Sequence, residues 1–90
     1  PNTSGTSLVD NYPNPFTINT TIRFTTTGGH TLIQIMNTLG QVIATLVDKE
    51  FATAGNYTVN WNNTPPAAGI YYVRLQNGPV QQVKAMLKVK

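Results

Sequence analysis

Hydrophobic and polar residues alternate over short stretches along most of this 90-residue chain. Alternation with a period of two predicts β-strands that bury one face and expose the other. No stretch carries an apolar stripe at the helical period over three turns, so we expect no helix. The positions expected to point inward are Ile22, Phe24, Ile33, Ile35, Ile43, Tyr57, Val59, Trp61, Tyr71, Val73 and Leu75.

Glycine and proline separate these stretches at intervals of roughly ten residues, which is typical of an antiparallel sandwich. The predicted strands begin at Leu8 and then cover 20–27, 31–37, 41–48, 56–62, 70–77 and 80–89, with 49–56 as a connection. The pattern predicts an all-β, immunoglobulin-like or fibronectin type III-like sandwich of about seven strands. Residues 1–7 read as a linker remnant, so the domain is expected at 8–90 and the chain as part of a larger protein.

The segment Asn11-Tyr12-Pro13-Asn14-Pro15-Phe16 is expected to form a rigid entry to the sheet. Pro13 and Pro15 fix their own backbone and disfavour helix in the residues before them. Tyr12 and Phe16 flank the turn as apolar anchors able to pack on the sheet. The other scaffold positions are Gly40, Gly69, Trp61 and Tyr71, with Gly40 in a turn that needs positive φ.

Charge and composition limit the kinds of partner and function that this chain can have. The chain has no cysteine, no apolar run of membrane-spanning length and a net charge of +3. Lys84, Lys88 and Lys90 supply half of the six Lys and Arg residues. A basic last strand suits an acidic protein groove, anionic lipid headgroups or nucleic acid, or serves as a solubilising sheet edge. Nucleic acid is the weaker option, because basic and aromatic residues are not interleaved.

Little in the chain suggests catalysis, a metal or a cofactor. His30 is the only histidine, and no nucleophile has an evident histidine and acid partner. Asp48 and Glu50 read as a solvated hairpin turn, with too few carboxylates for an ordinary Ca²⁺ site. Tyr72, with Tyr12 as a second candidate, is expected to face solvent, either as ordinary surface or as a platform for carbohydrate. We therefore expect a binding or interaction domain and no enzyme.

Several motifs in order resemble one family. After the Asn11–Phe16 segment come Thr20-Thr21-Ile22-Arg23-Phe24, Asn37-Thr38-Leu39-Gly40, Tyr57-Thr58-Val59-Asn60-Trp61, Gly69-Ile70-Tyr71-Tyr72-Val73-Arg74-Leu75 and Lys84-Ala85-Met86-Leu87-Lys88-Val89-Lys90. Over residues 8–90 this order is similar to the type A C-terminal sorting domains of the type IX (Por) secretion system. It is also related to the Ig-like domain of the flagellar hook-capping protein.

The resemblance implies a non-catalytic secretion signal and surface anchor on a larger secreted bacterial protein. Such domains pass through the periplasm, follow an N-terminal cargo domain and are recognised by an outer-membrane translocon. In many members of the family a surface sortase then removes the domain and attaches the cargo to anionic lipopolysaccharide. The recognition residues implied here are Lys84, Met86, Lys88 and Lys90, with Ala85-Met86 where the family often has Lys-Met. The alternative is an accessory module that binds carbohydrate or stabilises an attached hydrolase.

Overall fold

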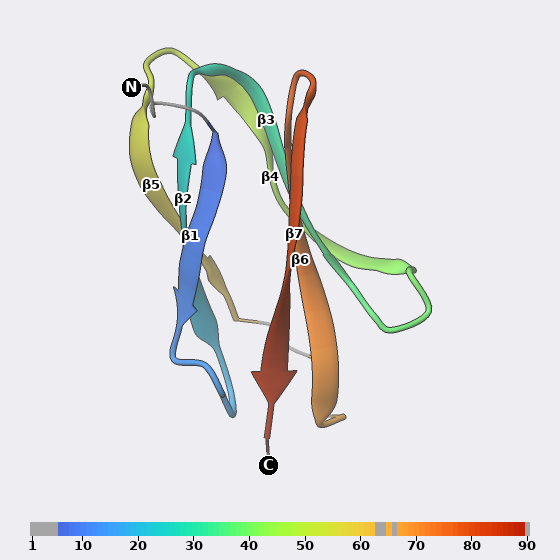
Figure 1. The fold of residues 1–90 in the computed structure, drawn as a ribbon. Helices are drawn as coiled ribbons and strands as arrows, with labels where there is room; N and C mark the ends of the chain where they lie inside the picture. The colour runs from blue at the N-terminus through green and yellow to red at the C-terminus, as the bar shows by residue number, and fades with distance from the viewer. Residues whose placement is uncertain (1–5, 63–64, 66, 90) are drawn as a thin grey trace.

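The computed structural model describes residues 6–62, 65 and 67–89, which form two layers of antiparallel strands packed face to face (Figure 1). This part of the chain contains seven strands and no helix. The strands are β1 (Ser7–Tyr12), β2 (Thr20–Thr26), β3 (Gly29–Met36), β4 (Val42–Phe51), β5 (Gly55–Trp61), β6 (Gly69–Asn77) and β7 (Val80–Lys88). The prediction of an all-β sandwich is confirmed.

The strand order identifies the type of sandwich. One sheet has the order β1-β2-β5, and the other has the order β4-β3-β6-β7. In immunoglobulin constant-type domains the fourth strand lies beside the fifth. Here it pairs with the third strand instead, as in fibronectin type III domains. Because β7 ends its sheet, the last strand described lies at an edge of the molecule.

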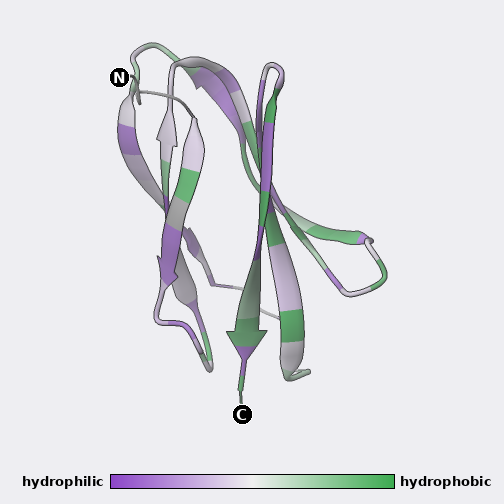
Figure 2. Ribbon diagram, in the orientation of Figure 1, coloured by the Kyte–Doolittle hydropathy of each residue, from purple (hydrophilic) through white to green (hydrophobic). Residues whose placement is uncertain are grey.

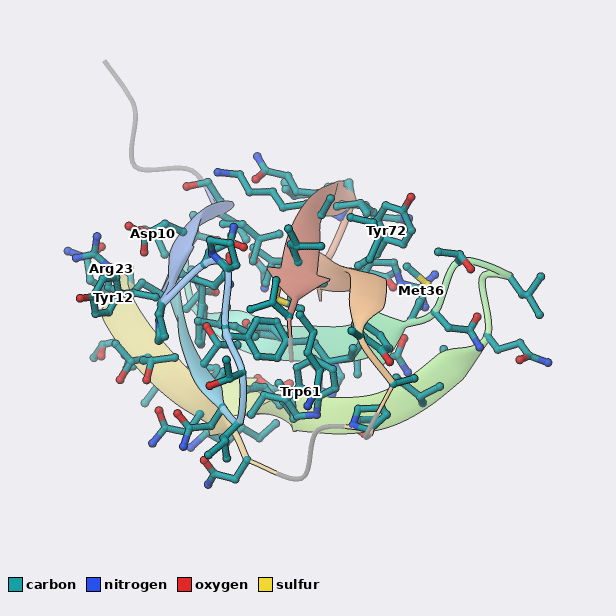
Figure 3. All side chains as sticks on the ribbon, turned by 90° about the horizontal axis from the view of Figure 1, so that it is seen from below. Asp10, Tyr12, Arg23, Met36, Trp61 and Tyr72 are labelled. Carbon is teal, nitrogen blue, oxygen red and sulfur yellow. The ribbon has the colours of Figure 1, made fainter. Side chains whose placement is uncertain are left out.

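The core lies between the sheets and is centred on Trp61, which is 2% exposed. Its ring centroid lies 5.7 Å from that of Phe16 and 5.6 Å from that of Tyr71, and Figure 3 shows it between the two layers. Hydrophobic and hydrophilic residues alternate along the strands in Figure 2. The other buried hydrophobic residues are Leu8, Ile22, Phe24, Ile33, Ile35, Val47, Phe51, Val73, Leu75 and Met86.

The sequence reading of β4 was wrong in two respects. Ile43 is 39% exposed, because two shifts in the β3–β4 register break the alternation, and Val47 fills the core position opposite Ile33. The strand also continues to Phe51 through the segment predicted as a connection. Consequently Asp48 and Glu50 lie in the strand and not in a hairpin turn.

β1 also departs from simple alternation. Leu8 pairs with Phe24 on the buried side, whereas Asp10 pairs with Arg23 after a register shift. Tyr12 therefore points outward and is 76% exposed. The expectation that it packs on the sheet was wrong, and the alternative that it faces solvent is confirmed. At the other end, Ser7 already belongs to β1 and Thr6 is buried, while the rest of the expected linker lies outside the described residues.

A buried polar side chain at the end of β6 was not anticipated from the sequence. The Asn77 Oδ1 accepts hydrogen bonds from the hydroxyls of Thr6 (2.6 Å) and Thr27 (3.0 Å). Its Nδ2 donates to the carbonyls of Gly28 (3.0 Å) and His30 (2.8 Å). One amide thus joins the start of β1, the β2–β3 turn and β6.

Two turns that the sequence marked are formed with glycine in the left-handed region. Gly40 has φ +82°, and its N–H donates to the carbonyl of Asn37 at 3.0 Å. Gly69 has φ +141° and begins β6. A side chain is disfavoured at both positions because few L-residues adopt such φ values. In the proline segment, Pro13 and Pro15 are exposed and both preceding peptide bonds are cis.

Candidate functional site

Three of the four residues proposed as the recognition site, Lys84, Met86 and Lys88, lie on β7 and differ in exposure. Lys84 is exposed, whereas Met86 is 1% exposed and Lys88 7% exposed. Lys90 lies outside the described residues. The register pairs Lys84 with Val73 and Met86 with Tyr71, so both side chains are on the inner side of their strand. Lys84 stays exposed on this side because β7 is an edge strand of its sheet, whereas Met86 and Lys88 are buried in the sandwich.

The proline segment forms hydrogen bonds with the free edge of β7 near the C-terminal end of that strand. The Phe16 N–H donates to the Leu87 carbonyl at 3.0 Å, and the Val89 N–H donates to the Phe16 carbonyl at 2.8 Å. The Leu87 N–H donates to the Asn14 Oδ1 at 3.2 Å. These bonds satisfy backbone groups that face away from β6. Residues 14–16 thus clip the end of the last strand to the start of the domain.

The direction of the other backbone groups on that edge can be inferred from the alternating hydrogen-bond pattern of an antiparallel sheet. The pairing of β6 with β7 is regular from Val80 to Lys88, and the backbone groups of Leu87 face outward. Alternate residues face the same way, so Val83 and Ala85 also direct their N–H and C=O groups away from β6. Among the described residues, no strand pairs with this stretch. Such an edge can accept an added strand.

Electrostatic contacts tie the lysines of β7 to neighbouring segments. The Lys88 Nζ lies 6.0 Å from the centroid of the Phe16 ring, within the range of a cation–π contact. The hydrogen bonds that Arg23 donates to Asp10 lower the pKa of that carboxyl, and the charges of Arg23 and Lys84 add to the effect. The charge of Lys84 on β7 therefore acts on the Asp10 carboxylate of β1, the neighbouring edge strand of the other sheet.

The outer face of the β4-β3-β6-β7 sheet is largely apolar beside the last strand, apart from Arg74, which pairs with Val83 and donates a hydrogen bond to Gln34. Tyr72 pairs with Met36 on β3 and with Ala85 on β7, and Figure 3 shows Met36 and Tyr72 directed away from the core. Further large hydrophobic residues are exposed on the strands of this sheet, namely Val42, Ile70, Val83 and Leu87. Alternation placed Tyr72 outward, but only the pairing of strands shows that it belongs to an apolar surface. Such a surface is typical of an interaction with another protein.

The remaining sequence candidates form no catalytic or metal centre among the described residues. The His30 Nε2 lies 2.6 Å from the Asp48 Oδ1, and both side chains are exposed. Glu50 pairs with His30 in the β3–β4 register and adds no third ligand. No group of three His, Cys, Asp or Glu residues in the described ranges could hold a metal ion. Within the same ranges, no helix has the length and apolar character needed to cross a membrane.

Comparison with known proteins gives one match. Searches of curated proteins and of solved structures found none. A model of the secretion system C-terminal sorting domain family matches residues 10–89, from the second half of β1 to the end of β7. The match includes the proline segment, the edge strand and the clip between them. This chain belongs to the C-terminal sorting domain family of the type IX secretion system, whose members are non-catalytic sorting signals on larger secreted proteins.

Proposed function

We propose that β7 is the part of this sorting domain that the outer-membrane translocon recognises, and that the domain then anchors its cargo at the cell surface. Family membership gives the type IX machinery as partner, a larger protein as cargo, and the cell surface or the outside as destination. The observation that carries the proposal is the open stretch of edge at Val83 and Ala85, beside the exposed Lys84. The apolar outer face next to it offers further contact area.

The four recognition residues have different roles in this proposal, according to their exposure. Strand addition at Val83 and Ala85 would supply main-chain hydrogen bonds, and an acidic group on the receptor would pair with Lys84. Met86 and Lys88 are buried, so in the folded domain they hold the strand in place. They would contact a receptor only after the strand leaves the sandwich. Lys90 adds a further positive charge two residues after Lys88 in the sequence.

The finer steps of the proposal follow the family pattern. The domain travels through the periplasm, and a surface sortase removes it while attaching the cargo to anionic lipopolysaccharide. A surface-attached product and a freely released product differ in whether the cargo sediments with cells. The mass of the cargo, measured after the cargo is detached from the cells, shows whether residues 1–90 were removed.

The test is a periplasmic reporter fused to residues 1–90 and expressed in a host with type IX secretion. We expect export of the fusion and loss of export when Val83–Lys90 is deleted. That deletion also removes the buried Met86, so variants that keep the core are needed. Val83→Pro removes an N–H that faces away from β6 and should fold, because edge positions tolerate proline. Lys84→Glu reverses the exposed charge.

Both substitutions should reduce export severalfold while the purified domains keep the circular dichroism spectrum of the parent. Leu39→Ala is the matched control, because Leu39 is 81% exposed at the β3–β4 turn, away from the edge of β7. It should export like the parent. Undiminished export after deletion of Val83–Lys90 would show that the signal lies elsewhere in the domain.

A further inference from the structure

The outer face of the β1-β2-β5 sheet carries a site that results from the register shift in β1. Leu8 is buried, so strict alternation would direct Asp10 and Tyr12 toward the core as well. After the shift, Asp10 pairs with Arg23 and Tyr12 pairs with Thr21, on the outer side of the sheet. Irregularities of this kind often occur beside functional sites, where they redirect a side chain.

The redirected residues form a compact polar group. The Arg23 Nε donates to the Asp10 Oδ1 at 2.7 Å, and its Nη2 donates to the Asp10 Oδ2 at 2.5 Å. Asp10, Tyr12, Thr21 and Arg23 line one shallow hollow. Figure 3 shows Asp10, Tyr12 and Arg23 together on the outside of β1 and β2, on the side opposite Tyr72. The Tyr12 ring, 76% exposed, is open to a ligand.

The same face continues across β2 and β5 with uncharged hydrogen-bonding groups. The hydroxyls of Thr21 and Thr25 donate to the Oδ1 atoms of Asn60 and Asn56. These bonds fix each amide with its oxygen occupied, and the NH₂ groups have no acceptor among the described residues. Thr58, between the two asparagines, is exposed opposite Arg23. The face therefore presents an ordered row of donors and hydroxyls.

The electrostatics of this face point to an uncharged ligand. Asp10 and Arg23 are the charged residues on it, and their bidentate pair has no net charge. A phosphate backbone or an acidic polymer would require several uncompensated cations. Lys84 acts on Asp10 from the neighbouring edge of β7, but no row of cations lies on this face among the described residues. A neutral sugar chain fits better, because each ring combines an apolar C–H face with several hydroxyls. An open aromatic ring beside fixed polar groups matches both properties.

We propose that this face binds a neutral glycan, with one sugar ring stacked on Tyr12 and its hydroxyls bonded to Asp10 and Arg23. The next sugars lie along the threonine and asparagine row of β2 and β5. This places carbohydrate binding on the sheet that does not contain β7. It is a function separate from sorting, and it acts for as long as the domain remains attached to its cargo.

The experiment is affinity electrophoresis of the 90-residue chain in native gels containing xylan, mannan, laminarin or hydroxyethyl cellulose, with the acidic polymer alginate as a fifth gel. At least one neutral polymer should retard the protein. Tyr12→Ala should abolish the retardation, and Tyr12→Phe should retain it because the ring remains. Tyr72→Ala is the matched control on the opposite sheet, and it should migrate like the parent in every gel.

A second measurement locates the contact. Titration of the ¹⁵N-labelled chain with the oligosaccharide of the retarding polymer should shift amides at residues 10, 12, 21 and 23 and leave those of β7 unchanged. Absence of retardation by all four neutral polymers overturns the proposal. So does retardation by alginate alone, or binding that survives Tyr12→Ala. Each of these results leaves the export assay unaffected, so the two proposals fail separately.

Discussion

Truncation of Trp61 to alanine should be the most damaging single substitution in this domain. The side chain is 2% exposed and contacts the rings of Phe16 and Tyr71, so it joins the proline segment to both sheets. Large-to-small changes of buried Trp cost about 3–5 kcal/mol. Each lost aromatic pair contributes about 0.5–1.5 kcal/mol within that total. A domain of this size is stable by only about 5–15 kcal/mol, so the substitution removes from about a fifth of that stability to all of it.

The assay is equilibrium urea unfolding followed by far-ultraviolet circular dichroism, which does not depend on the deleted fluorophore. At a slope of about 1 kcal/mol per M, the midpoint should fall by about 3 M or more. Tyr12→Ala is the control, since it also removes a large aromatic but from an exposed position, and it should change stability by about 0.5 kcal/mol or less. A loss below about 1 kcal/mol for Trp61→Ala would refute this description of the core.

Three further predictions concern polar contacts. Asn14→Ala removes the acceptor of the Leu87 N–H, so hydrogen exchange at the Leu87 amide should accelerate. The amides of β7 that are bonded to β6 should keep their protection. Unchanged exchange at Leu87 would argue against the clip. Asn77→Ala leaves several buried groups unpaired and should cost at least about 2 kcal/mol in urea unfolding, whereas a neutral effect would mean that water replaces the amide. Arg23 lowers the pKa of Asp10 below 3.8, so the stability gained from their pair is complete above that pH and is lost as the pH falls through the lower, folded value. In a carboxyl NMR titration, Arg23→Gln should return the pKa of Asp10 toward 3.8, and an unchanged titration would contradict the pairing.

Most of the fold could be predicted from the sequence because strands with one buried face impose a period of two. Ile22 and Phe24 on β2, and Tyr71 and Val73 on β6, are buried as the alternation indicated. The ordered motifs also led to the family that the comparison identified. Glycine and proline marked the turns, because few other residues tolerate the required backbone angles.

The errors occurred where the register of a strand pair shifts. Ile43 follows the local alternation in sequence, and Tyr12 was expected to pack because it flanks the prolines. Each lies in a strand whose register shifts in a way that the sequence of one strand does not reveal. A register belongs to two strands, so its irregularities depend on long-range packing. The clip has a similar origin, because Asn14 and Leu87 meet only when the first and last segments of the domain are folded together.

The most direct test of the central claim is site-specific photo-crosslinking in cells that export the domain. A benzoylphenylalanine placed at Ala85, on the edge and outer face of β7, should crosslink to an outer-membrane component of the secretion machinery. The same probe at Thr58, on the outer face of the other sheet, should give no such product. Equal crosslinking from both positions, or crosslinking from Thr58 alone, would contradict recognition through the last strand.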